Sequence, residues 1–273
     1  MKLIQLIPAL ALLLAATTAH AQEKDKKDKT SIVIDGNGIS INKSDSGKTE
    51  VKKEEKVFSI DVAMIDIGVN GIQDNTDYTS PAAKAFLNMP NGMKTDNLFS
   101  LQNAKSINVN VYPIMARLRL LKTGGQKIYL STGIGLQMYN FRFTKNISYL
   151  NNTQPELFLD STLFTKNKLG LTYLSVPLQA TFKTKIVEKA WLVYGFGITG
   201  GYRIASWTKQ VSGPFGKVKN HDKFNFADFN SCLTAEIGLD DYFRLYASYQ
   251  LTALHENALD QHPFCIGIRL GGM

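Results

Sequence analysis

The chain has 273 residues, of which 44% are hydrophobic, and 31 lysines and arginines against 23 aspartates and glutamates give a net charge of +8. Two cysteines in a chain of this length are too few for the disulfide framework of a small secreted domain. The basic charge is scattered rather than gathered into a compact aromatic-bearing face, so a nucleic-acid partner is not expected.

The first 21 residues predict a cleaved signal peptide. Residues 3–16 are almost wholly apolar after the positive Lys2, and "AHA" at 19–21 offers the small residues that signal peptidase reads. An uncleaved membrane anchor is the alternative, but the apolar run is shorter than the roughly 18 to 20 residues that span a bilayer. We therefore expect export, with residues 1–21 removed.

Residues 22–56 are dense in charge and hold no aromatic residue. Such a segment cannot bury enough apolar surface to offset the entropy of ordering it. Within it, "SIVIDGNGISIN" has alternating isoleucines on both sides of an Asn37-Gly38 turn signal, as in a β-hairpin. A calcium loop is the alternative, although the distal bidentate glutamate of such loops is absent from this spacing. We expect a charged periplasmic segment with a short hairpin.

From residue 57 onward, β-strand patterns follow one another and no convincing amphipathic helix is evident. In "SINVNVYPIMARLRLL", residues 106–121, polar and apolar residues alternate with the period of two that marks a strand with two unlike faces. The runs reach or approach the length of about 9 to 11 residues that a tilted strand needs to cross a bilayer. The expected strands are residues 57–72, 105–120, 126–145, 168–184, 190–207, 224–239, 242–255 and 262–271.

Short and long connections alternate between these runs. "LKTGGQ", "KIVEKA" and "LDDY" are short, whereas the connections before and between them are long. This alternation is typical of outer-membrane barrels, whose turns face the periplasm and whose loops face outward. Residues 57–273 are therefore predicted to form an all-β, eight-stranded antiparallel up-and-down transmembrane β-barrel with short periplasmic turns and long outer loops. A soluble lipocalin-like binding protein with inverted faces is the alternative.

Seven stretches resemble, in order, the successive strands of PorT-like outer-membrane β-barrel proteins of the Bacteroidota. They are "IDIGVNG", "KSINVNV", "STGIGLQMYNFRF", "YLSVPLQATF", "GGYRIASWTKQ", "LYASYQLTAL" and "HPFCIGIRL". The resemblance covers nearly all of the predicted barrel. It implies an outer-membrane barrel, usually of unassigned molecular role, and the secretion role of PorT itself is not carried over to this chain. We expect a structural or interaction role, for which secretion or envelope assembly is one setting. The family offers no catalytic motif to map onto this chain.

Charged residues are expected on the inner face of the barrel, where they must pair because an isolated buried charge is costly. The network could simply fill the interior, since eight strands enclose little more room than side chains need. It could instead plug or gate a narrow solute channel, which is the alternative function. The expected network consists of Asp61, Arg117, Arg119, Glu236, Arg244 and Arg269, with Asp66 as the alternative to Asp61.

Aromatic residues close the third and fifth predicted strands at their outer ends, where an interfacial girdle belongs. The expected girdle is Tyr139, Phe141, Phe143, Tyr202 and Trp207, and packing among the loops is a compatible second role. Four lysines of the third long loop could meet lipopolysaccharide phosphates or an acidic partner, or could simply be solvated. They are Lys209, Lys217, Lys219 and Lys223.

The sequence predicts no enzyme, no cofactor and no metal site. His221, His255 and His262 fall on predicted outer loops or near the rim, and none stands in a spaced motif with a serine nucleophile. Cys232 and Cys265 are expected about 9 to 10 Å apart with one strand between them, beyond disulfide reach. The expected partners are outer-membrane lipid, lipopolysaccharide, the insertion machinery during biogenesis and an envelope protein.

Overall fold

A computed structural model of the chain describes residues 29–35, 38–44, 57–88, 95, 97–150, 156–188, 190–240 and 243–271. The expected signal peptide lies outside these ranges. The chain divides into two compact units, and the barrel lies wholly within the second. No helix in the described ranges is long and apolar enough to cross a membrane.

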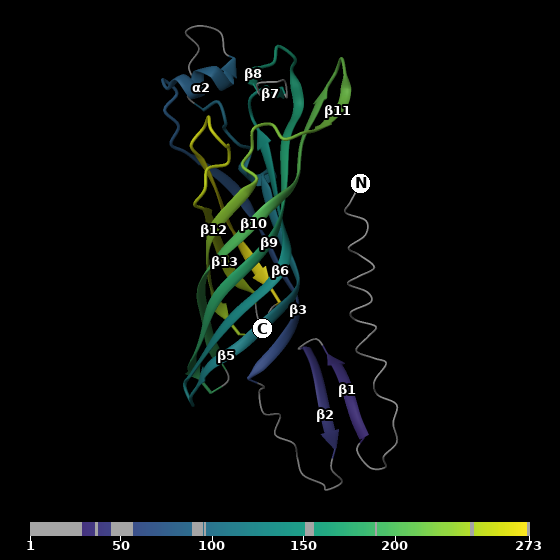
Figure 1. Cartoon of the computed structure of the whole chain (residues 1–273), viewed down its shortest axis with the longest axis vertical. Helices are drawn as coiled ribbons and strands as arrows, with labels where there is room; N and C mark the ends of the chain where they lie inside the picture. Colours follow the sequence, from purple (N-terminus) through teal and green to yellow (C-terminus); the bar gives the residue numbers. More distant parts are fainter. Residues whose placement is uncertain are drawn as a thin grey trace. The chain divides into compact units, whose positions relative to one another are not determined.

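The charged N-terminal segment contains a small sheet of its own. Strands β1 (Lys29–Asp35) and β2 (Gly38–Ser44) form this two-stranded sheet, and β2 begins at the glycine of the Asn37-Gly38 sequence (Figure 1). The strand boundaries therefore coincide with the segment in which isoleucines alternate with polar residues.

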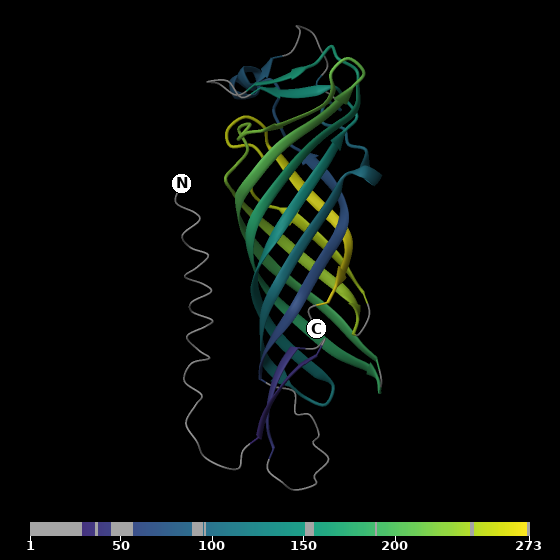
Figure 2. The same ribbon diagram turned by 90° about the vertical axis from the view of Figure 1, so that its right-hand side faces the viewer.

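Eight long strands form a closed antiparallel ring (Figures 1 and 2). Each pairs with the next along the chain, and the last pairs with the first, Ile268 opposite Ile67. This up-and-down ring confirms the predicted fold class. The strands are β3 (Phe58–Asp74), β5 (Ile107–Lys122), β6 (Gln126–Phe143), β9 (Phe164–Val187), β10 (Ala190–Ser212), β12 (Phe229–Leu239), β13 (Arg244–Gln250) and β14 (Gln261–Leu270).

The apolar face of each strand points outward over most of the barrel. Ile114 and Phe196 are 60% and 62% exposed, whereas the polar Asn110 and Gln137 are buried inside. Apolar outside and polar inside is the pattern that a barrel needs in hydrocarbon, and it is the reverse of the lipocalin-like alternative. In the alternating residues 106–121, the polar face lines the interior.

The pattern inverts near the outer ends of β6 and β9. In the middle of β6, Leu136 points outward and Gln137 points inward. Toward the outer end, the inward side carries Phe141, while Arg142 lies on the opposite face. We call the outward-facing apolar side chains, such as Ile114, Leu136 and Phe196, the apolar belt. Beyond this belt the strands carry an apolar core inside and polar groups outside, as a barrel surrounded by water requires.

The described parts of the outer loops lie at the mouth of the barrel (Figure 2). We name them the first (residues 75–106), second (144–163), third (213–228) and fourth (251–260) outer loops. A sheet is formed by β4 (Leu87–Asn88), β7 (Ile147–Leu150) and β8 (Glu156–Leu159), and β11 (Gly216–His221) extends the edge of β10.

A short helix, α2 (Pro81–Phe86), departs from the expectation of an all-strand chain. Pro81 suits its first turn, and the Ser80 hydroxyl accepts a hydrogen bond from the Ala83 backbone N–H at 3.2 Å. Strand β12 begins at Phe229, five residues later than predicted, and the consecutive Phe224 and Asn225 adopt positive φ angles outside the β region.

Candidate functional site: closed lumen and outer cap

A chain of ion pairs lies in the middle of the barrel. Asp66 accepts two hydrogen bonds from Arg269, at 2.6 Å from Nε and 2.9 Å from Nη2, which is the bidentate arrangement preferred by guanidinium and carboxylate. Glu236 pairs with Arg244 at 2.9 Å and also lies 3.4 Å from Arg269 Nη1. The two carboxylate side chains are fully buried, so each charge depends on its partners rather than on water.

Uncharged groups join this network to the opposite wall. Arg269 Nη1 donates to Gln179 Oε1 at 2.8 Å, and Thr181 Oγ1 donates to Glu236 Oε1 at 3.1 Å. The guanidinium of Arg269 also lies over the Tyr246 ring, 4.5 Å from its centroid. Gln179, Thr181 and Tyr246 were not among the predicted site residues, because alternation places them inside but cannot reveal which side chains meet across a lumen.

The predicted charge network lies at two levels of the barrel. Asp61 pairs with Arg117 at 2.6 Å nearer the turn end of the barrel, and Arg119 is half-buried two residues further along the same strand. Asp66, which the sequence offered only as an alternative to Asp61, is the acid at the centre of the lumen. Glu236, Arg244 and Arg269 lie together there.

An apolar plug fills the outer end of the barrel. All four outer loops contribute fully or almost fully buried side chains, and these pack on inward-facing residues of β6 and β9. This plug, which we call the outer cap, closes the mouth above the ion pairs. Representative members from the four loops are Phe86, Leu98, Ile147, Leu157, Phe226 and Leu254.

His255 lies in the middle of the outer cap. Its ring is 4.8 Å from the Phe226 ring and 5.4 Å from the Phe86 ring, centroid to centroid, and it stacks on Tyr149 at 6.2 Å. Within the described part of the chain, neither ring nitrogen has a hydrogen-bond partner. Burial lowers the pKa of His255 to about 3, so the imidazole is neutral at physiological pH.

Three members of the predicted girdle do not face the membrane. Tyr139, Phe141 and Phe143 point inward and belong to the outer cap, which corrects that expectation. The physical reason is the inversion of the strand pattern beyond the apolar belt. Tyr202 is exposed on the outer side, 5.1 Å from the ring of Phe229, and Trp207 is partly exposed.

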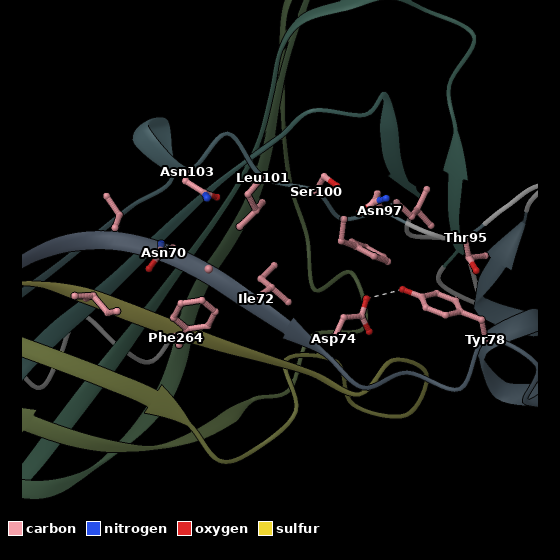
Figure 3. A pocket seen from close by; sticks show the side chains of 15 residues that line it. Asn70, Ile72, Asp74, Tyr78, Thr95, Asn97, Ser100, Leu101, Asn103 and Phe264 are labelled. Carbon is pink, nitrogen blue, oxygen red and sulfur yellow. Dashed lines mark hydrogen bonds between the residues drawn. The ribbon is translucent and has the colours of Figure 1, made fainter.

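A lateral groove of about 510 Å³ lies at the outer rim, between loop residues 95–103 and the ends of β3 and β14 (Figure 3). Exposed apolar side chains, including Val69 and Ile266, form part of its lining and continue the apolar belt. The Tyr78 hydroxyl donates to Asp74 at 2.5 Å beside the groove and ties the first outer loop to the end of β3. The sequence carried no signal for this groove, because distant segments build it.

His221, His262 and the two cysteines are distributed over β11, β12 and β14. His262 contacts the Gln250 carbonyl oxygen at 3.0 Å and the Asp260 carboxylate at 2.9 Å, while His221 is exposed on β11. Cys232 and Cys265 are buried free thiols on β12 and β14, with β13 between them. Among the described residues, no group of three or more histidine, cysteine or acidic side chains is arranged to hold a metal ion.

Comparison with known proteins adds little to this geometry. No family model and no curated protein sequence matches the chain. Two solved structures of Ail, the attachment invasion locus protein of Yersinia pestis, are similar to it, one of them in complex with the heparin analogue sucrose octasulfate. Identities are 11% and 13%, TM-scores are 0.25 and 0.26, and each match covers 77% of this chain and 97% of Ail. Scores this low leave the fold resting on the strand pairing described above.

Proposed function

We propose that the protein is an outer-membrane β-barrel that does not conduct solutes and acts through its outer surface, as a structural or interaction component of the cell envelope. The observation that carries this proposal is the closed lumen, in which Arg269 joins strands on opposite walls. A barrel with a filled interior can offer only its ends and its outer surface to other molecules.

The distribution of apolar surface supports a membrane location. Exposed aliphatic and aromatic side chains surround the barrel on every strand of the ring, for example Ile67, Ile114, Leu178 and Ile237. Burying such a belt in hydrocarbon is favourable by about 25 cal/mol for each Å² removed from water. In a soluble protein the same belt would be an aggregation liability.

The arrangement of the interior argues against the narrow channel considered from the sequence. An ion would meet the outer cap first and the Asp66–Arg269–Glu236 network below it. Opening a path requires separating buried opposite charges and breaking an apolar core, and each of these steps is costly. No observation in the structure favours the channel over the closed barrel.

The setting we propose is secretion or envelope assembly, and the resemblance to PorT-like barrels supports only the outer-membrane barrel itself. The outer cap and the lateral groove are the surfaces that a partner protein in the envelope would contact. A signal peptide on residues 1–21 belongs to the same proposal, because export must precede insertion into an outer membrane.

Fractionation combined with heat-modifiability on a gel tests the membrane part of the proposal. We expect the full chain to partition with the outer membrane and its unheated band to change mobility on boiling. Recovery in the aqueous periplasmic fraction without such a shift would overturn the proposal, because the apolar belt would then have to be covered by protein.

A further inference from the structure

Four cationic residues lie side by side on four adjacent strands at the outer end of the barrel. Arg142 on β6 pairs in register with Lys168 on β9, Lys168 with Lys209 on β10, and Lys209 with Lys219 on β11. We call these four residues the cationic row. Directly paired residues in an antiparallel sheet project from the same face, so the four side chains share one surface.

That surface is the outer one. The chain neighbours of Lys168 and Lys209, such as Leu169 and Thr208, are buried inside, so the lysines themselves project outward. Two more lysines lie one outward-facing position further along the strands, because Val211 pairs with both Lys166 and Lys217. Neighbouring strands are about 4.8 Å apart, so the cationic row extends over about 15 Å.

The charges of the row are not neutralised from within the described protein. Within the described ranges, no carboxylate forms an ion pair with Lys166, Lys168, Lys209, Lys217 or Lys219. The pKa of Lys209 is lowered, chiefly by the charge of Lys217, as expected where like charges repel. Like charges opposite one another destabilise a sheet, so this arrangement favours an external anion.

The row lies beyond the apolar belt. Leu174, Tyr202 and Phe229 pair in register and are all exposed, which marks the upper part of the belt on these strands. Trp207 follows between this belt and the cationic row, with Lys219 Nζ 4.8 Å from its ring centroid. A Cβ at position 170 would collide with the Trp207 indole, so Gly170 allows the ring to lie against the sheet.

We propose that the cationic row binds the phosphate groups of a phosphorylated lipid in the outer leaflet, with the acyl chains of that lipid against the belt below. This inference rests on the outer-membrane location proposed above. Lysine and arginine are the usual partners of phosphate, and tryptophan is enriched where headgroups meet hydrocarbon.

Continuity with the belt favours a lipid over a soluble polyanion. A lipid can present its phosphates to Lys168 and Lys209 while its chains extend past Trp207 toward the exposed Leu174 and Tyr202, about 20 Å further along the two strands. A soluble polyanion would use the charges alone and leave the adjacent apolar surface without a partner. The two ligands share phosphate chemistry and differ in this apolar contact, which an experiment can separate.

The test uses the full chain in phosphatidylcholine nanodiscs that contain increasing fractions of bisphosphorylated lipid A. The chain has two tryptophans, so a Trp191→Phe background leaves Trp207 as the only tryptophan reporter beside the row. We expect Lys168→Gln/Lys209→Gln to weaken the apparent affinity by about tenfold or more. The control Lys84→Gln/Lys105→Gln removes two exposed lysines of the first outer loop and should change the affinity less than about twofold.

Further measurements distinguish the loss of positive charge from a folding defect, and lipid binding from the binding of free phosphate. Lys168→Arg/Lys209→Arg should retain binding, and dephosphorylated lipid A should not produce the fluorescence change. Equal binding by the Gln variant and its control would overturn the inference, as would tighter binding of soluble polyphosphate than of lipid A. Gel mobility of the same nanodisc samples reports insertion separately. An uninserted protein would contradict the proposed function, whereas an inserted protein without row-dependent binding would contradict this inference alone.

Discussion

The guanidinium of Arg269 on β14 donates a hydrogen bond to the side-chain oxygen of Gln179 on β9, 2.8 Å away. These strands stand opposite each other, since three strands lie between them in either direction around the ring. One hydrogen bond therefore crosses the barrel at the level of the buried ion pairs. The interior is held together by contacts between walls as well as by pairing between neighbouring strands.

Replacing Arg269 should destabilise the barrel strongly. In Arg269→Met, the buried Asp66 carboxylate loses both of its guanidinium hydrogen bonds, and we expect the free energy of unfolding to fall by about 3 to 5 kcal/mol. Urea titration of the protein refolded into lipid vesicles measures this change. Lys185→Met, at an exposed position near the turn end of β9, serves as the control. A loss below about 1 kcal/mol in Arg269→Met would show that the ion pair is not important for stability.

Truncating a phenylalanine in the outer cap should loosen the outer loops. Phe226 is 1% exposed, so Phe226→Ala creates a cavity and should cost about 3 to 5 kcal/mol. We expect faster cleavage of the outer loops by protease added to reconstituted vesicles. Phe215 belongs to the same loop but is 69% exposed, so Phe215→Ala should behave like the unmodified protein. Equal cleavage rates for the two variants would contradict the packed cap.

The stability of the cap should depend on pH through His255. The unfolded chain protonates this histidine near pH 6.5, whereas burial lowers its folded pKa to about 3. Between these values only the unfolded state carries the proton, so stability is greatest above pH 6.5 and falls as the pH decreases. The slope from this group is about 1.4 kcal/mol for each pH unit.

His255→Phe removes the titrating group while preserving an aromatic ring among Phe86, Tyr149 and Phe226. We expect the variant to lose less thermal stability than the unmodified protein between pH 7.5 and pH 5. The temperature at which the folded gel band converts to the unfolded band measures this. His221→Phe changes an exposed histidine and should leave the pH dependence as it was. An unchanged pH dependence in His255→Phe would mean that water reaches the ring.

The strand count and the direction of the faces could be predicted from the sequence because both follow from local alternation. Ile266 and Ile268 face outward and Arg269 inward, as a period of two requires. The sequence also identified Glu236, Arg244 and Arg269 as interior charges. It offered Asp61 or Asp66 but not both, because a period of two places residues five apart on opposite faces. An irregularity at Ala63, whose φ is positive, turns both acids inward.

The expectation that Tyr139, Phe141 and Phe143 belong to the girdle is wrong because apolar residues do not face outward along the whole strand. Leu136 faces outward within the belt, but Phe141 and Phe143 face inward beyond it. The strand leaves the apolar belt where its apolar residues change from the outer to the inner face. In the sequence, Arg142 between the two phenylalanines indicates this change. The outer cap depends on contacts among four separate loops, and the lateral groove also joins segments distant along the chain, so no local pattern encodes either.

Ion conductance of the full chain in a planar lipid bilayer tests the closed barrel most directly. Samples whose gel mobility shows a folded, inserted barrel should give no conductance steps above those of the bare bilayer, because the Arg269–Gln179 contact and the outer cap close the lumen in series. Reproducible conductance steps from the same samples would contradict the account and would restore the narrow solute channel as the function of this protein.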